Sequence, residues 1–169
     1  MRDIRSMILK VIKDNPGIRY RELLRSLGTV NGVLSYHLYM LEHEEVIMVK
    51  RQGGMTRYYP KSIDERESRI LGMLRIPIVR RIVDLMLVND RCTLDDIALY
   101  VNRSKSTILW HMKRLVNEDI VTKNGNLYYI KDKGMITNIL AKYKDKLDKV
   151  DRIDVIADNY NYMMDEFRL

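Results

Sequence analysis

The sequence is poor in cysteine, and it has neither a long apolar run nor a leader-like N-terminus. Its single cysteine, Cys92, cannot form an internal disulfide, as is usual for proteins kept in a reducing compartment. The first residues do not combine the charged, apolar and small-residue regions of a signal peptide, and no apolar run approaches the roughly 20 residues that a membrane span needs. We therefore expect a soluble, cytoplasmic protein.

Motifs of catalysis and of metal binding are missing as well. The chain has no Gly-rich phosphate loop and no nucleophile elbow. Asp95 and Asp96 form a carboxylate pair, but favourable charge at a helix N-terminus explains them better than acid–base chemistry does. His37, His111 and Cys92 have no spacing typical of metal ligands. We expect no enzyme activity, no required cofactor and no metal site.

What the chain does have is an excess of positive charge. Its 169 residues include 30 Lys and Arg against 23 Asp and Glu, a formal charge of +7. This balance favours an anionic partner such as nucleic acid or a membrane surface. The basic excess is three in residues 1–68 and five in residues 69–134, whereas residues 135–169 carry one more acidic than basic side chain. The tail is therefore not the basic part.

The chain also contains an internal repeat. Residues 34–47 read LSYHLYMLEHEEVI, and residues 108–121 read ILWHMKRLVNEDIV. The two histidines, His37 and His111, are 74 positions apart, and the apolar positions around them keep the same offset. A chain of this length can hold two small domains of roughly 60 to 80 residues each. We therefore expect one structural unit to occur twice.

Each copy begins with two helical segments. Apolar residues recur at helical spacing over residues 3–14, and the breakers NPG at 15–17 stop the run. The aligned run in the second copy opens with Pro77, a residue suited to the first turn of a helix. Thr93 and Asp96 have the spacing of a capping box before the next helix. The short second helices contain Leu23 and Leu27 in the first copy and Ile97 and Val101 in the second.

The repeated stretch itself predicts the third helix of each copy. Its inward-facing residues are Leu34, Leu38 and Leu41 in the first copy, and Ile108, Met112 and Leu115 in the second. A hairpin follows each helix: residues 47–60 turn at Gly53 and Gly54, and residues 121–130 turn at the Asn-Gly pair that begins at Asn124. Such pairs favour tight turns because both residues can adopt positive φ. Three helices and a two-stranded wing therefore occur twice.

These features resemble a known family. In the first copy, small residues, LSYHLYMLE, an acidic corner, VI, a basic hairpin and RYYP follow one another, with counterparts in the second copy. The series resembles the winged helix-turn-helix DNA-binding domains of the arsenic-repressor-like group, especially archaeal regulators that carry two such domains, over residues 3–134. The resemblance implies that the third helix enters the major groove while the wing lies over the DNA backbone or minor groove.

One position departs from the family pattern. Such regulators often have a serine where Val30 stands, as Ser104 does in the second copy. Valine has no side-chain oxygen with which to cap a helix. We therefore expect the first recognition helix to begin differently, at Thr29 or Asn31.

The predicted fold is mainly α with small β wings: two tandem winged helix-turn-helix domains plus a C-terminal helix. The expected parts are a first winged domain over 1–61, a linker helix over 62–76, a second winged domain over 77–134 and a C-terminal helical segment over 135–169. The linker opens with the capping box SIDE at 62–65 and has no Gly/Ser run, so we expect it to be structured.

The resemblance also implies a set of DNA-contacting residues. On the recognition helices these are Asn31, Ser35, Tyr36, His37 and Tyr39, and then Lys105, Ser106, Leu109, Trp110, His111 and Lys113. On the wings they are Lys50, Arg51, Gln52 and Arg57, and then Lys123, Asn124 and Asn126. Polar members can bond base edges or phosphates, and Leu109 can meet a thymine methyl. For Tyr36 and Trp110 the favoured alternative is packing beside the wing, and each histidine either touches a phosphate or packs at the helix flank.

The tail has a different pattern. Apolar residues alternate spacings of four and three, as in a coiled-coil seam, at Ile136, Leu140, Tyr143, Leu147 and Val150. This seam favours a homodimer through the C-terminal helix. The alternative is a helix packed back on the chain's own winged domains.

Together these patterns favour a sequence-specific transcription regulator that binds double-stranded DNA through two recognition helices and basic wings. The alternative is a winged-helix module that binds proteins of the transcription machinery, since a fold alone does not settle function. Basic wings beside polar recognition helices favour DNA as the partner.

Overall fold

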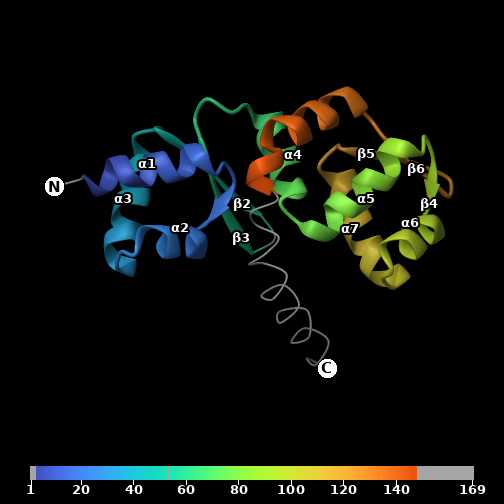
Figure 1. Ribbon diagram of the computed structural model, residues 1–169, viewed down its shortest axis with the longest axis horizontal. Coiled ribbons are helices and arrows are strands. Elements are labelled where there is room, and N and C mark those ends of the chain that lie inside the picture. Colours follow the sequence, from blue (N-terminus) through green and yellow to red (C-terminus); the bar gives the residue numbers. More distant parts are fainter. Residues whose placement is uncertain (1–2, 53, 148–169) are drawn as a thin grey trace. The chain divides into compact units, whose positions relative to one another are not determined.

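A computed structural model of the chain describes residues 3–52 and 54–147. Over these residues the chain is mainly helical, with two small sheets of three strands each. Its contacts divide it into two compact units, Met1–Gly72 and Met73–Leu169. The predicted fold class is confirmed, because each unit contains a repeat of three helices and a small antiparallel sheet, and a helix follows the second repeat (Figure 1).

The first unit contains the predicted three helices and wing. Its elements are α1 (Ile4–Asp14), β1 (Ile18–Arg19), α2 (Tyr20–Leu27), α3 (Asn31–His43), β2 (Ile47–Gln52) and β3 (Met55–Pro60). α4 (Glu65–Leu74) follows, and the division between the two units falls inside this helix. The four-part division of the chain stays a prediction.

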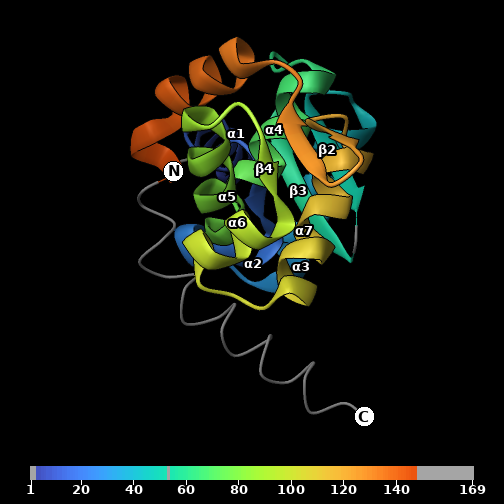
Figure 2. The same ribbon diagram turned by 90° about the vertical axis from the view of Figure 1, so that its right-hand side faces the viewer.

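The second unit repeats the order of elements. They are α5 (Pro77–Val88), β4 (Cys92–Thr93), α6 (Leu94–Val101), α7 (Lys105–Asn117), β5 (Val121–Asn124) and β6 (Leu127–Ile130). A further helix covers residues 133–147. α6 contacts both α5 and α7, and Figure 2 shows the three helices of this unit together.

Side-chain caps begin several helices, but the capping box predicted over residues 62–65 is wrong. α4 begins at Glu65, and Asp64 Oδ1 accepts from the N–H of Glu67 at 2.7 Å. A carboxylate oxygen of Asp3 accepts a hydrogen bond from the backbone N–H of Arg5, 3.1 Å away, and opens α1. At the start of α6, Thr93 Oγ1 accepts from the N–H of Asp96 at 3.2 Å, and Asp96 Oδ2 accepts from the N–H of Thr93 at 2.8 Å. The predicted capping box is confirmed, and it satisfies two N–H groups that have no partner within the helix.

Each sheet has a third strand that the sequence pattern did not predict. β1 pairs antiparallel with β3, with Ile18 opposite Tyr58, and β4 pairs with β6, with Cys92 opposite Tyr128. The strand orders are β1-β3-β2 and β4-β6-β5, so β3 and β6 are central strands. Two residues are too few to show the alternation by which strands are recognised.

The two cores use equivalent positions. The first unit buries Ile8, Ile12, Ile18, Leu23, Leu34, Leu38, Leu41 and Ile47. The residues 74 positions later, also buried, are Ile82, Met86, Cys92, Ile97, Ile108, Met112, Leu115 and Val121. Cys92 thus occupies the core position of Ile18, and burial raises the pKa of its thiol. Fully burying a large aliphatic side chain contributes about 1.5 to 3 kcal/mol, so this shared list explains why both copies fold alike.

The backbone repeats as closely as the core does. Gly28 and Asn102 end α2 and α6 in the left-handed region, with φ of 58° and 56°. Glu45 and Asp119, which follow α3 and α7, have φ of 55° and 61°. The members of each pair are 74 positions apart. The backbone therefore bends in the same way before and after α3 as it does before and after α7.

The wings differ in length. β2 and β3 have six residues each, whereas β5 and β6 have four each. The turn of the shorter hairpin lies one residue later than predicted: Asn124 is the last residue of β5 and pairs with Leu127, so the two turn residues are Gly125, with a φ of 59°, and Asn126.

The C-terminal helix is attached to the second unit at its start. Asp132 Oδ1 accepts from the N–H of Met135 at 2.9 Å. Lys133 Nζ donates to the carbonyl oxygen of Leu87 at 3.2 Å and to Asp90 Oδ1 at 2.8 Å. These bonds tie the first turn of this helix to the end of α5.

The residues of the predicted dimer seam lie partly in the protein interior. Within the single chain Ile136, Tyr143 and Leu147 are buried and Leu140 is half-buried, whereas Val150 lies outside the described residues. Burial within one chain is what the alternative, a helix packed on its own chain, requires.

Candidate nucleic-acid interface

α3, the predicted first recognition helix, presents most of its predicted residues to solvent. Asn31, Ser35, Tyr36 and Tyr39 are exposed, and His37 is half-buried. Leu34, Leu38 and Leu41 hold the opposite face in the core. The predicted groove-facing side of α3 is therefore open.

Two polar residues of α3 are held by a residue that the sequence reasoning missed. The hydroxyl oxygen of Tyr20, the first residue of α2, lies 2.9 Å from the carbonyl oxygen of Asn31 and 2.8 Å from Ser35 Oγ. It also contacts the side-chain oxygen of Asn31. No sequence motif predicts this contact, because Tyr20 reaches α3 only through the packing of α2 against α3. Asn31 and Ser35 are consequently engaged within the protein.

α3 begins at one of the two expected residues, but this position is aligned with the start of α7, so the two helices differ in their caps and not in where they begin. The helix starts at Asn31, and Val30 is its N-cap residue without a side-chain cap hydrogen bond. α7 has a conventional start, since Ser104 Oγ accepts from the N–H of Thr107 at 3.3 Å. The second recognition helix therefore has a satisfied first turn where the first lacks one.

Two cations of the first wing form ion pairs with carboxylates of the same unit. Arg51 donates two hydrogen bonds to Glu42, each 2.6 Å long, and these bonds lower the pKa of the Glu42 carboxyl. Lys50 Nζ contacts a carboxylate oxygen of Glu65. Gln52, beside them, is exposed. Much of the positive charge expected on this wing is thus matched by negative charge.

Arg57 is buried, with 7% of its surface exposed. Its Nη1 donates to the carbonyl oxygen of Gly17 at 2.8 Å. The cause is the third strand: β1 pairs with β3 and sets Arg19 opposite Arg57, which makes the wing strand a central one. A guanidinium held in this way cannot reach DNA, so Arg57 is removed from the set of DNA contacts.

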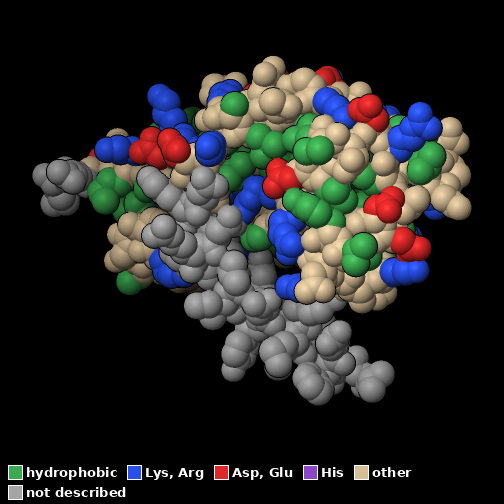
Figure 3. Space-filling model, turned by 45° about the vertical axis from the view of Figure 1, so that its right-hand side comes forward, with side chains coloured by type: hydrophobic (Ala, Val, Ile, Leu, Met, Phe, Trp, Pro, Cys, Tyr) green, Lys and Arg blue, Asp and Glu red, His purple; other side chains and the backbone are tan. Residues whose placement is uncertain are grey.

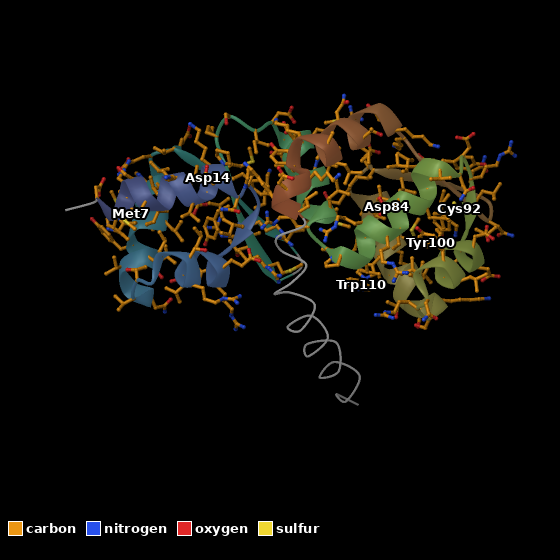
Figure 4. All side chains as sticks on the ribbon, viewed as in Figure 1. Met7, Asp14, Asp84, Cys92, Tyr100 and Trp110 are labelled. Carbon is orange, nitrogen blue, oxygen red and sulfur yellow. The ribbon has the colours of Figure 1, made fainter. Side chains whose placement is uncertain are left out.

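The second recognition helix, α7, exposes a mixed basic and aromatic face. Lys105, Ser106, Trp110 and Lys113 are exposed and Leu109 is half-buried. Trp110 is labelled on this helix in Figure 4.

Arg114 was missed by the sequence reasoning. Its guanidinium carbon lies 4.7 Å from the centroid of the Trp110 ring, a cation–π arrangement. The spacing of Trp110 and Arg114 could have predicted this contact, because residues four apart on a helix share a face.

Lys105 pairs with Asp95 at 2.6 Å, but both side chains are about two-thirds exposed, so solvent screens the pair. Lys113 has no ion-pair partner within the described residues.

His111 is buried, unlike its counterpart His37. Only 7% of its surface is exposed, and its ring meets that of Trp110 edge-on, with centroids 4.7 Å apart. Burial, with a smaller contribution from the charge of Arg114, lowers the pKa of His111 to about 4. The ring is therefore neutral near pH 7. Its Nδ1 has no hydrogen-bond partner within the described chain. Because the ring is buried, His111 is also removed from the set of DNA contacts.

The second wing is short and carries exposed polar side chains. Lys123, Asn124 and Asn126 are all exposed. Lys123 Nζ lies 5.7 Å from the centroid of the Tyr128 ring, and in the part of the chain that the structure describes it forms no ion pair. This wing therefore offers a cation whose charge is not matched.

The aligned recognition segments differ in charge. Residues 31–60 contain three basic and three acidic side chains, whereas residues 105–134 contain six basic and three acidic ones. Charged side chains alternate with exposed hydrophobic ones on the face shown in Figure 3, and no single basic field covers it. The cationic character thus belongs mainly to the second recognition segment.

Neither a membrane span nor a metal site is seen in residues 3–52 and 54–147. In those ranges, no helix is both long and apolar enough to cross a bilayer. Nor do three His, Cys, Asp or Glu side chains gather there in a way that could hold a metal ion. Cys92 lies on β4 and Trp110, beside His111, on α7 (Figure 4).

Comparison with known families matches both units. Residues 2–71 match a family described as an N-terminal HTH domain, and residues 77–122 match one described as winged helix-turn-helix DNA-binding. The matches agree with the observed fold of two tandem winged helix-turn-helix domains, as the resemblance implied. It is 32% identical, over 136 residues, to an uncharacterised HTH-type transcriptional regulator of the archaeon Methanocaldococcus jannaschii. That match covers 78% of this chain and 34% of the relative, so the chain spans about a third of the relative's length.

Solved structures resemble the chain only distantly. The mRNA-binding domain of elongation factor SelB from E. coli, in complex with SECIS RNA, has a TM-score of 0.35 and 15% identity, covering 78% of this chain and all of that one. The Nse1-Nse3-Nse4 complex has a TM-score of 0.36 and 11% identity, covering 86% of this chain and 76% of that one. These scores are too low to inform function.

Proposed function

We propose that the protein is a transcription regulator that binds double-stranded DNA sequence-specifically and performs no catalytic step. In this proposal α3 and α7 are recognition helices, and the second unit supplies most of the electrostatic affinity. The observation that carries the proposal is the pair of exposed cations, Lys113 on α7 and Lys123 on β5, which have no ion-pair partner within the described residues. The match of this unit to a DNA-binding family supports it.

The proposed contact set contains the predicted residues that are exposed or half-buried. In the first unit it contains Asn31, Ser35, Tyr36, His37, Tyr39, Lys50, Arg51 and Gln52. In the second it contains Lys105, Ser106, Leu109, Trp110, Lys113, Lys123, Asn124 and Asn126, to which we add Arg114. Polar members would bond phosphates or base edges, and the ion-paired cations of the first wing would contribute less than those of the second.

Selecting bound fragments from a genomic DNA pool, followed by titration of a selected fragment at several salt concentrations, tests the proposal. A regulator enriches a defined sequence, and its log affinity falls steeply with log salt because Lys and Arg release counterions from phosphates. Lys10→Ala with Lys13→Ala, which removes two exposed charges from α1, is the matched control for charge loss and should leave enrichment intact. Absence of any salt-dependent retention on DNA would exclude the proposal in favour of a protein-docking module.

The first wing provides the specific observation for that second candidate. Arg51 and Lys50 are matched by Glu42 and Glu65, which reduces the attraction of this wing for phosphates. A first unit that binds a protein of the transcription machinery would account for that pairing.

Self-association is a separate part of the proposal. Burial of Ile136, Tyr143 and Leu147 within one chain supports a helix that packs on its own unit over a coiled-coil seam. A homodimer would then use another surface. Sedimentation of the intact protein at increasing concentration tests whether the C-terminal helix forms a dimer. Leu140→Glu, at the half-buried position, should leave the oligomeric state unchanged.

A further inference from the structure

The exposed face of α3 is apolar and aromatic. Among the described residues of the first unit, every large hydrophobic side chain that is exposed lies on α3 or on its N-cap: Val30 (67%), Val33 (40%), Tyr36 (61%) and Tyr39 (64%). With Leu34, Leu38 and Leu41 in the core, the period of the helix directs Tyr36 and Tyr39 away from it. Gly32 precedes Tyr36 by one turn, and no atom lies within 4 Å of the place where its Cβ would be, so the backbone itself is accessible there.

The same face offers few hydrogen-bonding groups for reading bases. α3 contains no Lys or Arg. Asn31 and Ser35, the polar residues of its first turns, are engaged by the hydroxyl of Tyr20. α7 presents Lys105 and Lys113 at the positions aligned with Asn31 and Tyr39. The two recognition helices therefore offer different chemistry at the same place in the fold.

We propose that α3 selects thymine, through contact of Val33, Tyr36 and Tyr39 with the C5-methyl groups that thymine presents in the major groove. This inference rests on the proposed function. The methyl is the one apolar group among the base edges of that groove, so a face of this chemistry discriminates for it, whereas hydrogen-bonding faces discriminate by donors and acceptors. Gly32 allows the helix backbone to approach the groove closely.

A protein partner fits this face less well. Four partly exposed side chains supply on the order of a few hundred Å² of apolar surface. A stable protein interface covers about 800 Å² on each partner, with a fully buried apolar centre. The face of one helix is, in contrast, what a major groove accommodates.

Replacing thymine by deoxyuridine tests the inference, because it removes the methyl and keeps base pairing. In a fragment enriched from the genomic pool, each thymine would be replaced in turn and the affinity measured by fluorescence anisotropy at one salt concentration. Burial of one methyl corresponds to about fourfold in affinity. We expect a loss of this size at each contacted thymine for the unmodified protein.

A variant pair assigns the loss to α3. Tyr36→Ala with Tyr39→Ala removes exposed rings that the core does not need, so the protein should stay folded by circular dichroism. This variant should lose most of the sensitivity to deoxyuridine, because only Val33 of the three proposed contacts remains. Lys105→Ala with Lys113→Ala, at aligned positions of α7, should keep the full sensitivity to deoxyuridine.

Three results would overturn the inference. One is an unmodified protein that binds both fragments equally while still showing steep salt dependence, which leaves the proposed function standing. Another is a double tyrosine variant that keeps the whole sensitivity. The third is the absence of specific DNA binding under all conditions, which removes the proposed function as well.

Discussion

The two units share their interiors and differ at their surfaces. Core positions and left-handed backbone residues recur at an offset of 74 residues. α3 and α7 are therefore held in their units by equivalent parts of the backbone. Yet the first recognition segment has as many acidic as basic side chains, whereas the second has twice as many basic as acidic ones. A repeat therefore conserves what folding requires, and its exposed positions are free to serve different contacts.

Ion pairing deepens the difference between the units. Arg51 and Lys50 of the first wing contact Glu42 and Glu65, whereas Lys123 of the second wing contacts only the ring of Tyr128 within the described residues. Cations matched by neighbouring carboxylates gain less from a phosphate, because binding DNA must first break or share the existing pair. Counting Lys and Arg on a wing is thus a poor measure of its attraction for DNA.

The equivalence of the two cores is tested by truncating aligned residues. Leu34→Ala and Ile108→Ala each remove a fully buried aliphatic side chain. Each should lower the free energy of unfolding by about 2 to 5 kcal/mol, through lost burial and the cavity left behind. Urea unfolding followed by circular dichroism measures both, with Tyr39→Ala as an exposed control expected to stay within about 0.5 kcal/mol. A negligible loss for either core variant would show that the repeat does not extend to energetics.

The two histidines should differ in their effect on acid stability. Unfolded His111 takes up a proton near pH 6.5, whereas folded His111 does so only near its pKa of about 4. The contribution of neutral His111 to the free energy of unfolding is therefore fully present above about pH 6.5. It is lost as the pH falls toward 4, at about 1.4 kcal/mol per pH unit.

Unfolding by urea at several pH values between 7 and 4 measures that slope. His111→Leu should flatten it, while His37→Leu should leave it in place, because His111 remains. Equal slopes for the unmodified protein and His111→Leu would contradict the buried, neutral state.

The unequal wings are tested by the salt dependence of DNA binding. Lys113→Ala with Lys123→Ala removes two cations that have no ion-pair partner in the described chain, and should flatten log affinity against log salt by about 1.8. Lys50→Ala with Arg51→Ala removes two cations that are already matched and should change the slope less. Fluorescence anisotropy with one DNA fragment measures both. A larger change for the first-wing variant would reverse the comparison.

The reverse substitution sharpens the same test. Glu42→Gln with Glu65→Gln removes the carboxylates while keeping side-chain size, so Arg51 and Lys50 become available to phosphates. Affinity should rise and the salt slope should steepen. Asp14→Asn, at an exposed position of α1, serves as the control for the loss of a negative charge.

The smallest expected difference concerns the starts of the recognition helices. Val30→Ser gives α3 the cap that α7 has and should raise the free energy of unfolding by about 0.5 to 1 kcal/mol. Ser104→Ala should lower it by about 1 kcal/mol. Thermal unfolding compares these variants with Val30→Ala, which adds no cap. If Val30→Ala stabilised the protein as much as Val30→Ser does, the gain in stability would not come from the serine cap.

The helices and their order could be predicted because apolar spacing and caps are local properties. Thr93 and Pro77 mark predicted helix starts that the structure contains, and the repeat predicted where the third helices lie. Tertiary effects could not be predicted in this way. β1 has only two residues, and without it nothing indicated that β3 becomes a central strand and buries Arg57.

The candidate site shows the same limit. Which residues lie on the recognition helices followed from the repeat, but whether each is exposed depends on what packs against it. His37 is half-buried and His111 is buried, although they occupy one position of the repeat. Ion pairs such as Arg51 with Glu42 also depend on how a strand meets a helix, which sequence spacing does not report.

The difference in wing length has a consequence for the size of a bound DNA site. Each strand of the first wing is two residues longer than its counterpart, and an extended residue spans about 3.3 Å, so the first wing extends about 7 Å further from its sheet. Successive base pairs are separated by about 3.4 Å along the duplex. A wing lying along the axis of a duplex would therefore reach about two base pairs further in the first unit than in the second, which would make the protected region asymmetric even though the two folds are alike.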